Sequence, residues 1–242
     1  MGRFRPLLVL VAFALVASAC NLLVNPWGPG GISRPYYCDP TDTAINDGHT
    51  GPMVPGAPPT PFELAYTQPK GPLSAADCQS VTTDVRAATA FVSQFPTVAD
   101  AEAAGWKQAA VWTPGQGIHY VDPARLTGPL DLQKPNWLMY DGTAPDSKLT
   151  GMMFLTDTGS TTPPAGFAGG NDQFHQHGPL CTDTTPGAYP FIIGEQMTSA
   201  ECTAIGGINL VYNTVWMVHV WLPVYDGWLP TDLFNRTHPS IP

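Results

Sequence analysis

Residues 210–222 read LVYNTVWMVHVWL, a run rich in β-branched and aromatic side chains. A continuous apolar run of this kind predicts a strand that is buried on both faces of a sheet. His219 is the polar residue within its apolar part, 215–222, and a buried imidazole needs a hydrogen-bond partner or a metal. The run therefore predicts both a sheet around it and a specific partner for His219.

From Trp106 onward the chain consists of short β-rich runs separated by turn residues. The turns include Thr113-Pro114-Gly115 and Asp141-Gly142, both of which have strong turn-forming chemistry. Besides residues 210–222, the expected strands are 107–112, 117–121, 137–140, 149–156, 173–177 and 191–193.

The segment before these strands carries two helix signatures. Ser74 and Asp77 resemble a capping box, and apolar residues then recur at three- and four-residue steps up to a proline. Thr97 begins a second helix over residues 98–104, and a further short helix is expected at residues 198–205. This order predicts an α+β domain with two N-terminal helices packed on a mostly antiparallel β-sheet or partly open barrel.

The first twenty residues have the pattern of a secretory signal. Arg3 and Arg5 form a positive region, and residues 7–16 form an apolar run that is too short to span a bilayer. The pattern resembles a bacterial lipoprotein signal, which implies that the mature chain begins at a lipidated, palmitate-carrying Cys20. Ordinary signal cleavage after Ala19 is the alternative. The resemblance implies a location at the cell membrane, lipid-anchored on its extracytoplasmic face.

Three regions are expected along the chain. Residues 1–19 form the lipoprotein signal peptide, residues 20–73 form a proline- and glycine-rich tether, and residues 74–242 form a single α+β domain. A domain of about 170 residues is large enough for one hydrophobic core.

The charge balance is acidic. The chain has 10 basic and 19 acidic residues, for a formal net charge of −9. Without residues 1–19, which contain two arginines and no acidic residue, the remainder has 8 basic and 19 acidic residues and a charge of −11. Such a surface argues against nucleic acid or anionic lipid as a partner, and the sequence leaves any protein partner unknown.

Four cysteines remain when the lipidation site is set aside, and an even number predicts two disulfides in an exported protein. Three pairings are possible. We expect Cys38–Cys78 and Cys181–Cys202, because the members of each pair are close along the chain. The alternative makes Cys181 a metal thiolate, since it follows His177 by four residues.

Four histidines lie in apolar or glycine-rich stretches. His175 and His177 flank a single glutamine, and residues i and i+2 of a strand point to the same face. His119 lies in GIHYV at residues 117–121, and His219 lies in the run quoted above. The long intervals between them place the imidazoles on separate strands. Three or four converging imidazoles would form a first-row transition-metal site.

Each of these residues also has a structural interpretation. His175 and His177 could form a polar hairpin rim, and His219 could donate to a backbone carbonyl in the core. Met217 shares a strand face with His219, so it is a candidate copper ligand as well as a core residue.

The sequence identifies no catalytic residue with certainty. Glu195, which follows an apolar strand, is a candidate general base beside a metal-bound water.

The same regions carry a family resemblance. The features are Ala-Gly-Trp before a strand, Gly-Ile-His-Tyr-Val, Trp-Leu-Met-Tyr-Asp, a His-x-His run ending in Leu-Cys, and Trp-Met-Val-His-Val-Trp. Over residues 97–222 the chain resembles a group of exported bacterial proteins that share this pattern. The group carries no activity that could be transferred to this chain. The resemblance therefore implies no function, and its shared motifs contain the same histidines.

We therefore expect a cell-surface lipoprotein that binds one divalent transition-metal ion, zinc or copper ahead of iron or nickel. Four ligands would close the site for storage, delivery or structural support, whereas three would leave a position for water and permit hydrolysis or oxidation. The sequence leaves enzymatic activity open between these cases. The alternative is a metal-free binding module that recognises a cell-wall or carbohydrate ligand through tryptophans and an acidic surface.

Overall fold

The computed structural model describes residues 63–66, 73–183, 191–194, 197–210, 214–222, 233–234 and 241, and only the backbone of residues 63–66. All of these residues belong to a single structural unit. Within this part of the chain, no helix combines the length and the apolar character needed to cross a membrane.

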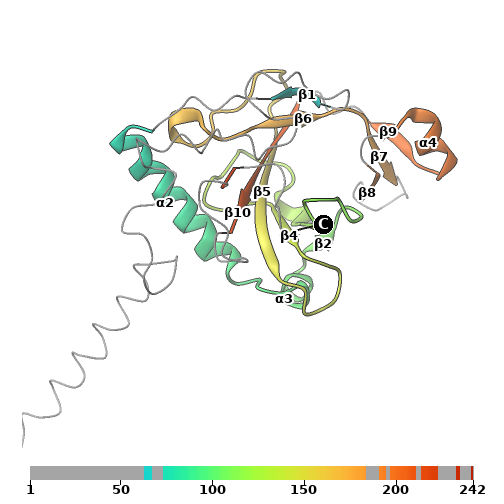
Figure 1. Cartoon of the computed structure of the whole chain (residues 1–242), viewed down its shortest axis with the longest axis horizontal. Helices are drawn as coiled ribbons and strands as arrows, with labels where there is room; N and C mark the ends of the chain where they lie inside the picture. The colour runs from blue at the N-terminus through green and yellow to red at the C-terminus, as the bar shows by residue number, and fades with distance from the viewer. Residues whose placement is uncertain are drawn as a thin grey trace, which may run out of the picture. The chain divides into compact units, whose positions relative to one another are not determined.

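β10 (Val215–Trp221) and β5 (Leu149–Asp157) form the centre of the main sheet, and they lie side by side in Figure 1. They pair in antiparallel fashion from Val215↔Asp157 to Trp221↔Gly151. Residues 216–221 are all buried, so both faces of β10 are covered. The absence of polar alternation in its sequence follows from this two-sided burial.

The main sheet has seven strands in the order β1-β6-β10-β5-β4-β3-β2, and every pairing between neighbours is antiparallel. The sheet is open, because β1 and β2 form its two edges. The remaining strands of this sheet are β1 (Glu63–Tyr66), β2 (Lys107–Gln108), β3 (Ile118–Val121), β4 (Trp137–Tyr140) and β6 (His175–His177).

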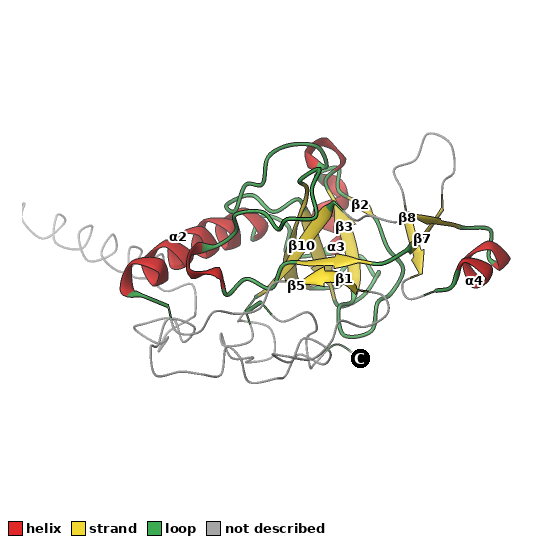
Figure 2. Ribbon diagram, turned by 90° about the horizontal axis from the view of Figure 1, so that it is seen from above, coloured by secondary structure: helices red, strands yellow, loops and turns green. Residues whose placement is uncertain are grey.

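A second sheet has three strands in the order β8-β7-β9. They are β7 (Leu180–Asp183), β8 (Phe191–Gly194) and β9 (Ile208–Leu210). Helix α4 (Ser199–Ala204) lies beside β7 in Figure 2, and Cys181 of β7 is disulfide-bonded to Cys202 of α4. Backbone hydrogen bonds of Ile192 with Ala109 and Val111 join this sheet to the segment that follows β2.

The two longer helical signatures form helices near their predicted positions. α2 (Ala75–Val92) is capped by the Ser74 side chain, which accepts a hydrogen bond from the Asp77 backbone. α3 (Val98–Ala103) begins with a capping box in which Thr97 and Asp100 bond each other's backbone. Short 3-10 helices occupy Pro123–Arg125 (η4) and Ala168–Gly170 (η5).

The two faces of the main sheet are covered differently. On one face, the Tyr120 hydroxyl donates to Glu102 of α3, and the Tyr140 hydroxyl donates to the backbone oxygen of Phe95 between α2 and α3. Burial raises the pKa of Tyr140, and nearby Asp100 and Tyr120 raise it further. The helical segments therefore shield this face. The opposite face carries an apolar cluster of Ala109, Val121, Trp137, Met153 and Met217.

The predicted fold class is confirmed at the level of a mixed protein with a mostly antiparallel, unclosed sheet. Residues 1–62 are not among the described residues. The prediction that α2 and α3 are the first helices of the chain therefore stays a prediction.

The observed strands differ from the predicted ones in three respects. The strand predicted at 107–112 is shorter, because β2 ends at Gln108. β1 and β7 were not predicted: β1 falls within the expected tether, and β7 follows the Gly178-Pro179 pair directly after β6. The run at 210–222 is not one strand, since β9 ends at Leu210 and β10 starts at Val215.

The disulfide between Cys181 and Cys202 is confirmed. The alternative role of Cys181 as a metal thiolate is therefore wrong, because its sulfur is oxidised in the bond to α4. Cys78 is also disulfide-bonded. Its predicted partner, Cys38, lies outside the described residues, as do the signal peptide, Cys20 and Glu195.

Candidate functional site

The four singled-out histidines come together on one side of the main sheet. His119 is on β3, His219 on β10, and His175 and His177 are on β6. Each is buried, with no more than 5% of its surface exposed. Their rings form a row: the centroids are 5.9 Å apart for His119–His219, 5.3 Å for His219–His175 and 5.2 Å for His175–His177.

These separations can be compared with metal ligation. A metal–nitrogen bond of about 2.0–2.1 Å places two tetrahedrally arranged imidazole centroids roughly 5 Å apart. Each neighbouring pair in the row is close to that spacing. However, no three His, Cys, Asp or Glu side chains in the described part of the chain already surround a common point that could hold an ion. The rings lie beside one another in pairs and do not form a completed cage.

The tautomer of His175 follows from its hydrogen bond. Its Nδ1 lies 3.0 Å from the backbone oxygen of Gln173. A carbonyl oxygen can only accept, so Nδ1 carries a proton, and in the neutral ring Nε2 then keeps its lone pair. Metal-binding histidines are commonly oriented in this way, by a backbone carbonyl on the nitrogen that does not bind the metal.

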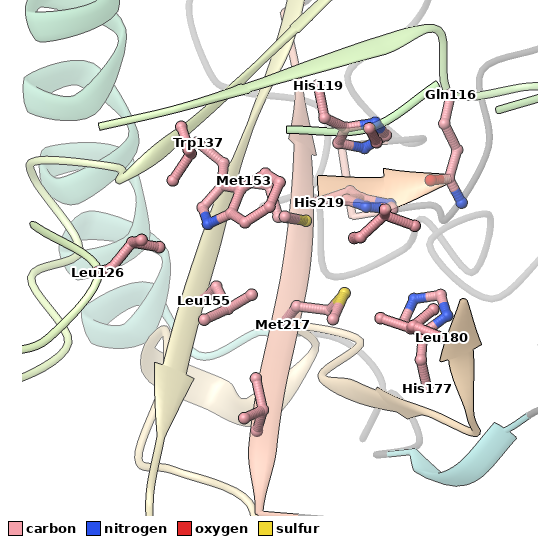
Figure 3. Close-up of a pocket in the computed structure, with 14 residues that line it drawn as sticks. Gln116, His119, Leu126, Trp137, Met153, Leu155, His177, Leu180, Met217 and His219 are labelled. Atoms are coloured by element: carbon pink, nitrogen blue, oxygen red, sulfur yellow. The ribbon is translucent and has the colours of Figure 1, made fainter. Parts of the chain in front are cut away.

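A pocket of about 160 Å³ lies against the row of histidines. Its polar lining consists of His119, His177, His219 and Gln116, whereas His175 does not line it. In Figure 3 these polar side chains lie on one side of the pocket, and Trp137, Leu126 and Leu155 lie on the other. The apolar lining comprises Ala110, Val121, Leu126, Trp137, Met153, Leu155, Leu180, Ile192, Val215 and Met217.

The pocket opens between side chains that are only half-buried. Leu126, Leu155, Ile192 and Val215 are of this kind, and the other lining residues are buried. No Asp, Glu, Lys or Arg of the described residues lines the pocket. An ionic ligand would therefore lose its hydration without gaining a counter-ion, and a neutral molecule or a metal ion held by imidazoles fits the lining better.

The structure thus brings together all four histidines predicted as ligands. Gln116 was not predicted to line the site. It is buried and follows a Thr-Pro-Gly turn, so no periodic pattern marked it. The tryptophans considered for ligand recognition are mostly inside: Trp106, Trp137, Trp216 and Trp221 are buried, and Trp112 is 38% exposed.

Comparison with known proteins adds no further assignment. No protein-family model, no curated protein and no solved structure matches this chain.

Proposed function

We propose that this protein binds one transition-metal ion through His119, His175, His177 and His219, as a lipoprotein anchored to the outer face of a cell membrane. One observation carries the metal proposal: four buried imidazoles from three strands lie in a row with centroid separations of 5.2–5.9 Å. Gathering four imidazoles in a buried place has no evident value for packing alone. Several imidazoles can share one transition-metal ion as its ligands.

Binding would require the rings to adjust. Since no three ligands converge in the described residues, the imidazoles must rotate about their side-chain bonds to meet one ion. The strands already hold neighbouring rings near ligand-pair spacing. Zinc and copper are the preferred ions, since both accept imidazole ligands.

The pocket is relevant to the choice between a catalytic and a closed metal site. His119, His177 and His219 line it, so an ion that they hold would stand beside a space accessible to a small molecule. Three protein ligands and one exchangeable position would suit catalysis, whereas ligation by His175 as well would close the site.

Elemental analysis of the purified mature protein tests the proposal. We expect one equivalent of zinc or copper in the wild type and none in the His175→Ala/His177→Ala variant. His49→Ala is the matched control, because it removes a histidine from the predicted tether and should leave the metal content unchanged. A wild-type protein that takes up neither zinc, copper, iron nor nickel would refute the proposal.

The anchor has its own test. Mass spectrometry of the native protein should find a lipidated Cys20 at the N-terminus, and Cys20→Ser should release the protein from membranes. An unmodified N-terminus at residue 20 would instead indicate a secreted protein.

The pocket supports a second candidate, a metal-free binding protein. Its volume of about 160 Å³ is similar to the roughly 150 Å³ engineered cavity that binds benzene. Its apolar lining favours a small apolar molecule over a sugar. Ala110→Leu would fill part of the pocket and should abolish binding of indole, measured by calorimetry on chelator-treated protein. Val111→Leu, on the adjacent exposed position, should leave it intact.

A further inference from the structure

Three of the four histidines have a methionine as their direct partner on a neighbouring strand. His119 of β3 pairs with Met139 of β4, and His219 of β10 pairs with Met153 of β5. His175 of β6 pairs with Met217 of β10. Directly opposite residues of antiparallel strands project from the same face, with their Cβ atoms about 4.5–5.5 Å apart. The sheet therefore sets imidazoles and thioethers next to each other three times.

His219 stands between two of these thioethers. Met217 precedes it by two residues on β10, so both side chains project from the same face, and Met153 is opposite it on β5. All three residues are buried and line the pocket. Figure 3 shows the sulfur atoms of Met153 and Met217 on the side of His219. Met139 does not line the pocket.

Methionine is a common filler of hydrophobic cores, so burial alone would indicate nothing. Position is more informative. Met152, the neighbour of Met153 on β5, pairs with Val220 and projects to the opposite face. β5 and β10 thus carry thioethers on the same face as His219, at the positions that flank it. Met152 is a buried methionine of β5 that lies on the opposite face, so it serves as a comparison.

We propose that the bound metal is copper in its cuprous state, with the thioethers of Met153 and Met217 acting as ligands beside His219 and a second imidazole. The inference rests on the proposed function and narrows the imidazole ligands of the ion to two of the four. Thioether sulfur is a soft donor that selects Cu(I), whereas zinc favours imidazole, thiolate and carboxylate. Cu(I) also accepts low coordination numbers. It can therefore use two adjacent imidazoles where no set of three is formed among the described residues.

The test is an anaerobic titration of the full mature protein with Cu(I) against a chromophoric chelator, and in parallel with Zn(II). Met153→Leu and Met217→Leu should each weaken Cu(I) binding at least about tenfold, the size of effect that loss of even an outer partner produces at metal sites. Zn(II) binding should be unchanged. Met152→Leu is the matched control and should alter neither. Met→Leu conserves volume, and circular dichroism would verify that each variant is folded.

X-ray absorption of the copper-loaded wild type identifies the donor atoms around the ion directly. We expect a sulfur shell as well as a nitrogen shell around copper, with the sulfur shell lost in Met153→Leu/Met217→Leu. A metal-loaded protein with nitrogen ligands alone, or equal Cu(I) affinity in all the methionine variants, would overturn the thioether assignment and leave the histidine site standing. Failure to bind any metal would overturn both.

Discussion

Gly117 sets the direction of the chain two residues before His119. Its φ is +80°, in the left-handed region that glycine adopts without strain. A Cβ at this position would also collide with the backbone oxygen of Tyr140, because β3 and β4 approach closely here. The placement of His119 therefore depends on a residue that has no side chain.

We expect Gly117→Ala to destabilise the protein much more than Gly105→Ala. Both positions have positive φ, but a Cβ at Gly105 would meet nothing within 4 Å. Gly105→Ala should cost about 1–2 kcal/mol, the value for a left-handed conformation alone. Gly117→Ala adds a backbone collision, so its cost should be clearly larger. Urea denaturation measures both variants, and equal costs would show that the close approach at Tyr140 is absent.

At the scale of elements, the disulfide Cys181–Cys202 joins β7 to α4 across a sequence separation of 21 residues. The enclosed loop contains β8, which in turn bonds to the segment after β2. The disulfide therefore holds in place the small sheet whose Leu180 and Ile192 line the pocket.

The Cys181→Ala/Cys202→Ala variant should lose about 3 kcal/mol of unfolding free energy, the estimate for a loop of this size. The loss arises mainly because the unfolded chain gains freedom. Denaturation of the variant beside wild type without reductant measures it, and a peptide map of the wild type under non-reducing conditions verifies the pairing. Two reactive thiols in the folded wild type would contradict the assignment.

The start of α4 has a pH-sensitive cap. Glu201 accepts hydrogen bonds from the Thr198 backbone and hydroxyl, and these bonds lower its pKa from the ordinary 4.5, the backbone bond contributing most. A lowered folded-state pKa stabilises the protein above the unfolded value, and this contribution is lost as the pH falls through the folded value.

We therefore expect the difference in stability between wild type and Glu201→Gln to be constant near neutral pH. It should shrink as the pH falls below about 4.5, the unfolded-state pKa. Carboxyl NMR titration should place the Glu201 pKa below that value in wild type and closer to it in Thr198→Val. A Glu201 pKa at or above 4.5 in the wild type would show that the cap does not form in solution.

At the scale of the whole molecule, the main sheet separates two environments. Helical segments pack against the face that carries Tyr120 and Tyr140, while the other face holds the histidines and the pocket. The four candidate ligand histidines therefore lie on strands of the sheet rather than on loops. A ligand on that face would bind the folded state and not the unfolded chain.

Metal should accordingly stabilise the whole fold. At a free metal concentration of about 100 times the dissociation constant, the gain in unfolding free energy is about 2.7 kcal/mol. We expect a raised melting temperature for the wild type with copper or zinc, and no change for His119→Ala/His219→Ala. Calorimetric scans with and without metal measure the shift. Equal shifts in both proteins would mean that the metal binds elsewhere.

Much of the local structure could be predicted from the sequence. The caps at Ser74 and Thr97 mark the starts of α2 and α3, because capping depends on residues three positions apart. The two-residue spacing of His175 and His177 places both rings on one face, because strand side chains alternate. The short interval between Cys181 and Cys202 likewise favoured their pairing. Each of these signals is contained within a short stretch.

The order of the strands and their register could not be predicted in this way. The surroundings of His119 and His219 indicated two buried strands, but not that β5 and β4 would lie between them in the sheet. The same holds for the alignment of His219 with Met153, which depends on the register of strands far apart in sequence. Strand pairing is decided by which buried faces fit together over the whole domain, and no local pattern records it.

The sequence by itself therefore determined most of the buried strands, where the helices begin and which four imidazoles needed a common explanation. Only the tertiary structure decided that these imidazoles form a row, that thioethers of Met153 and Met217 flank His219, and that a pocket opens beside them. The physical reason is that burial and capping depend on local periodicity, whereas a site depends on contacts between strands separated by tens of residues.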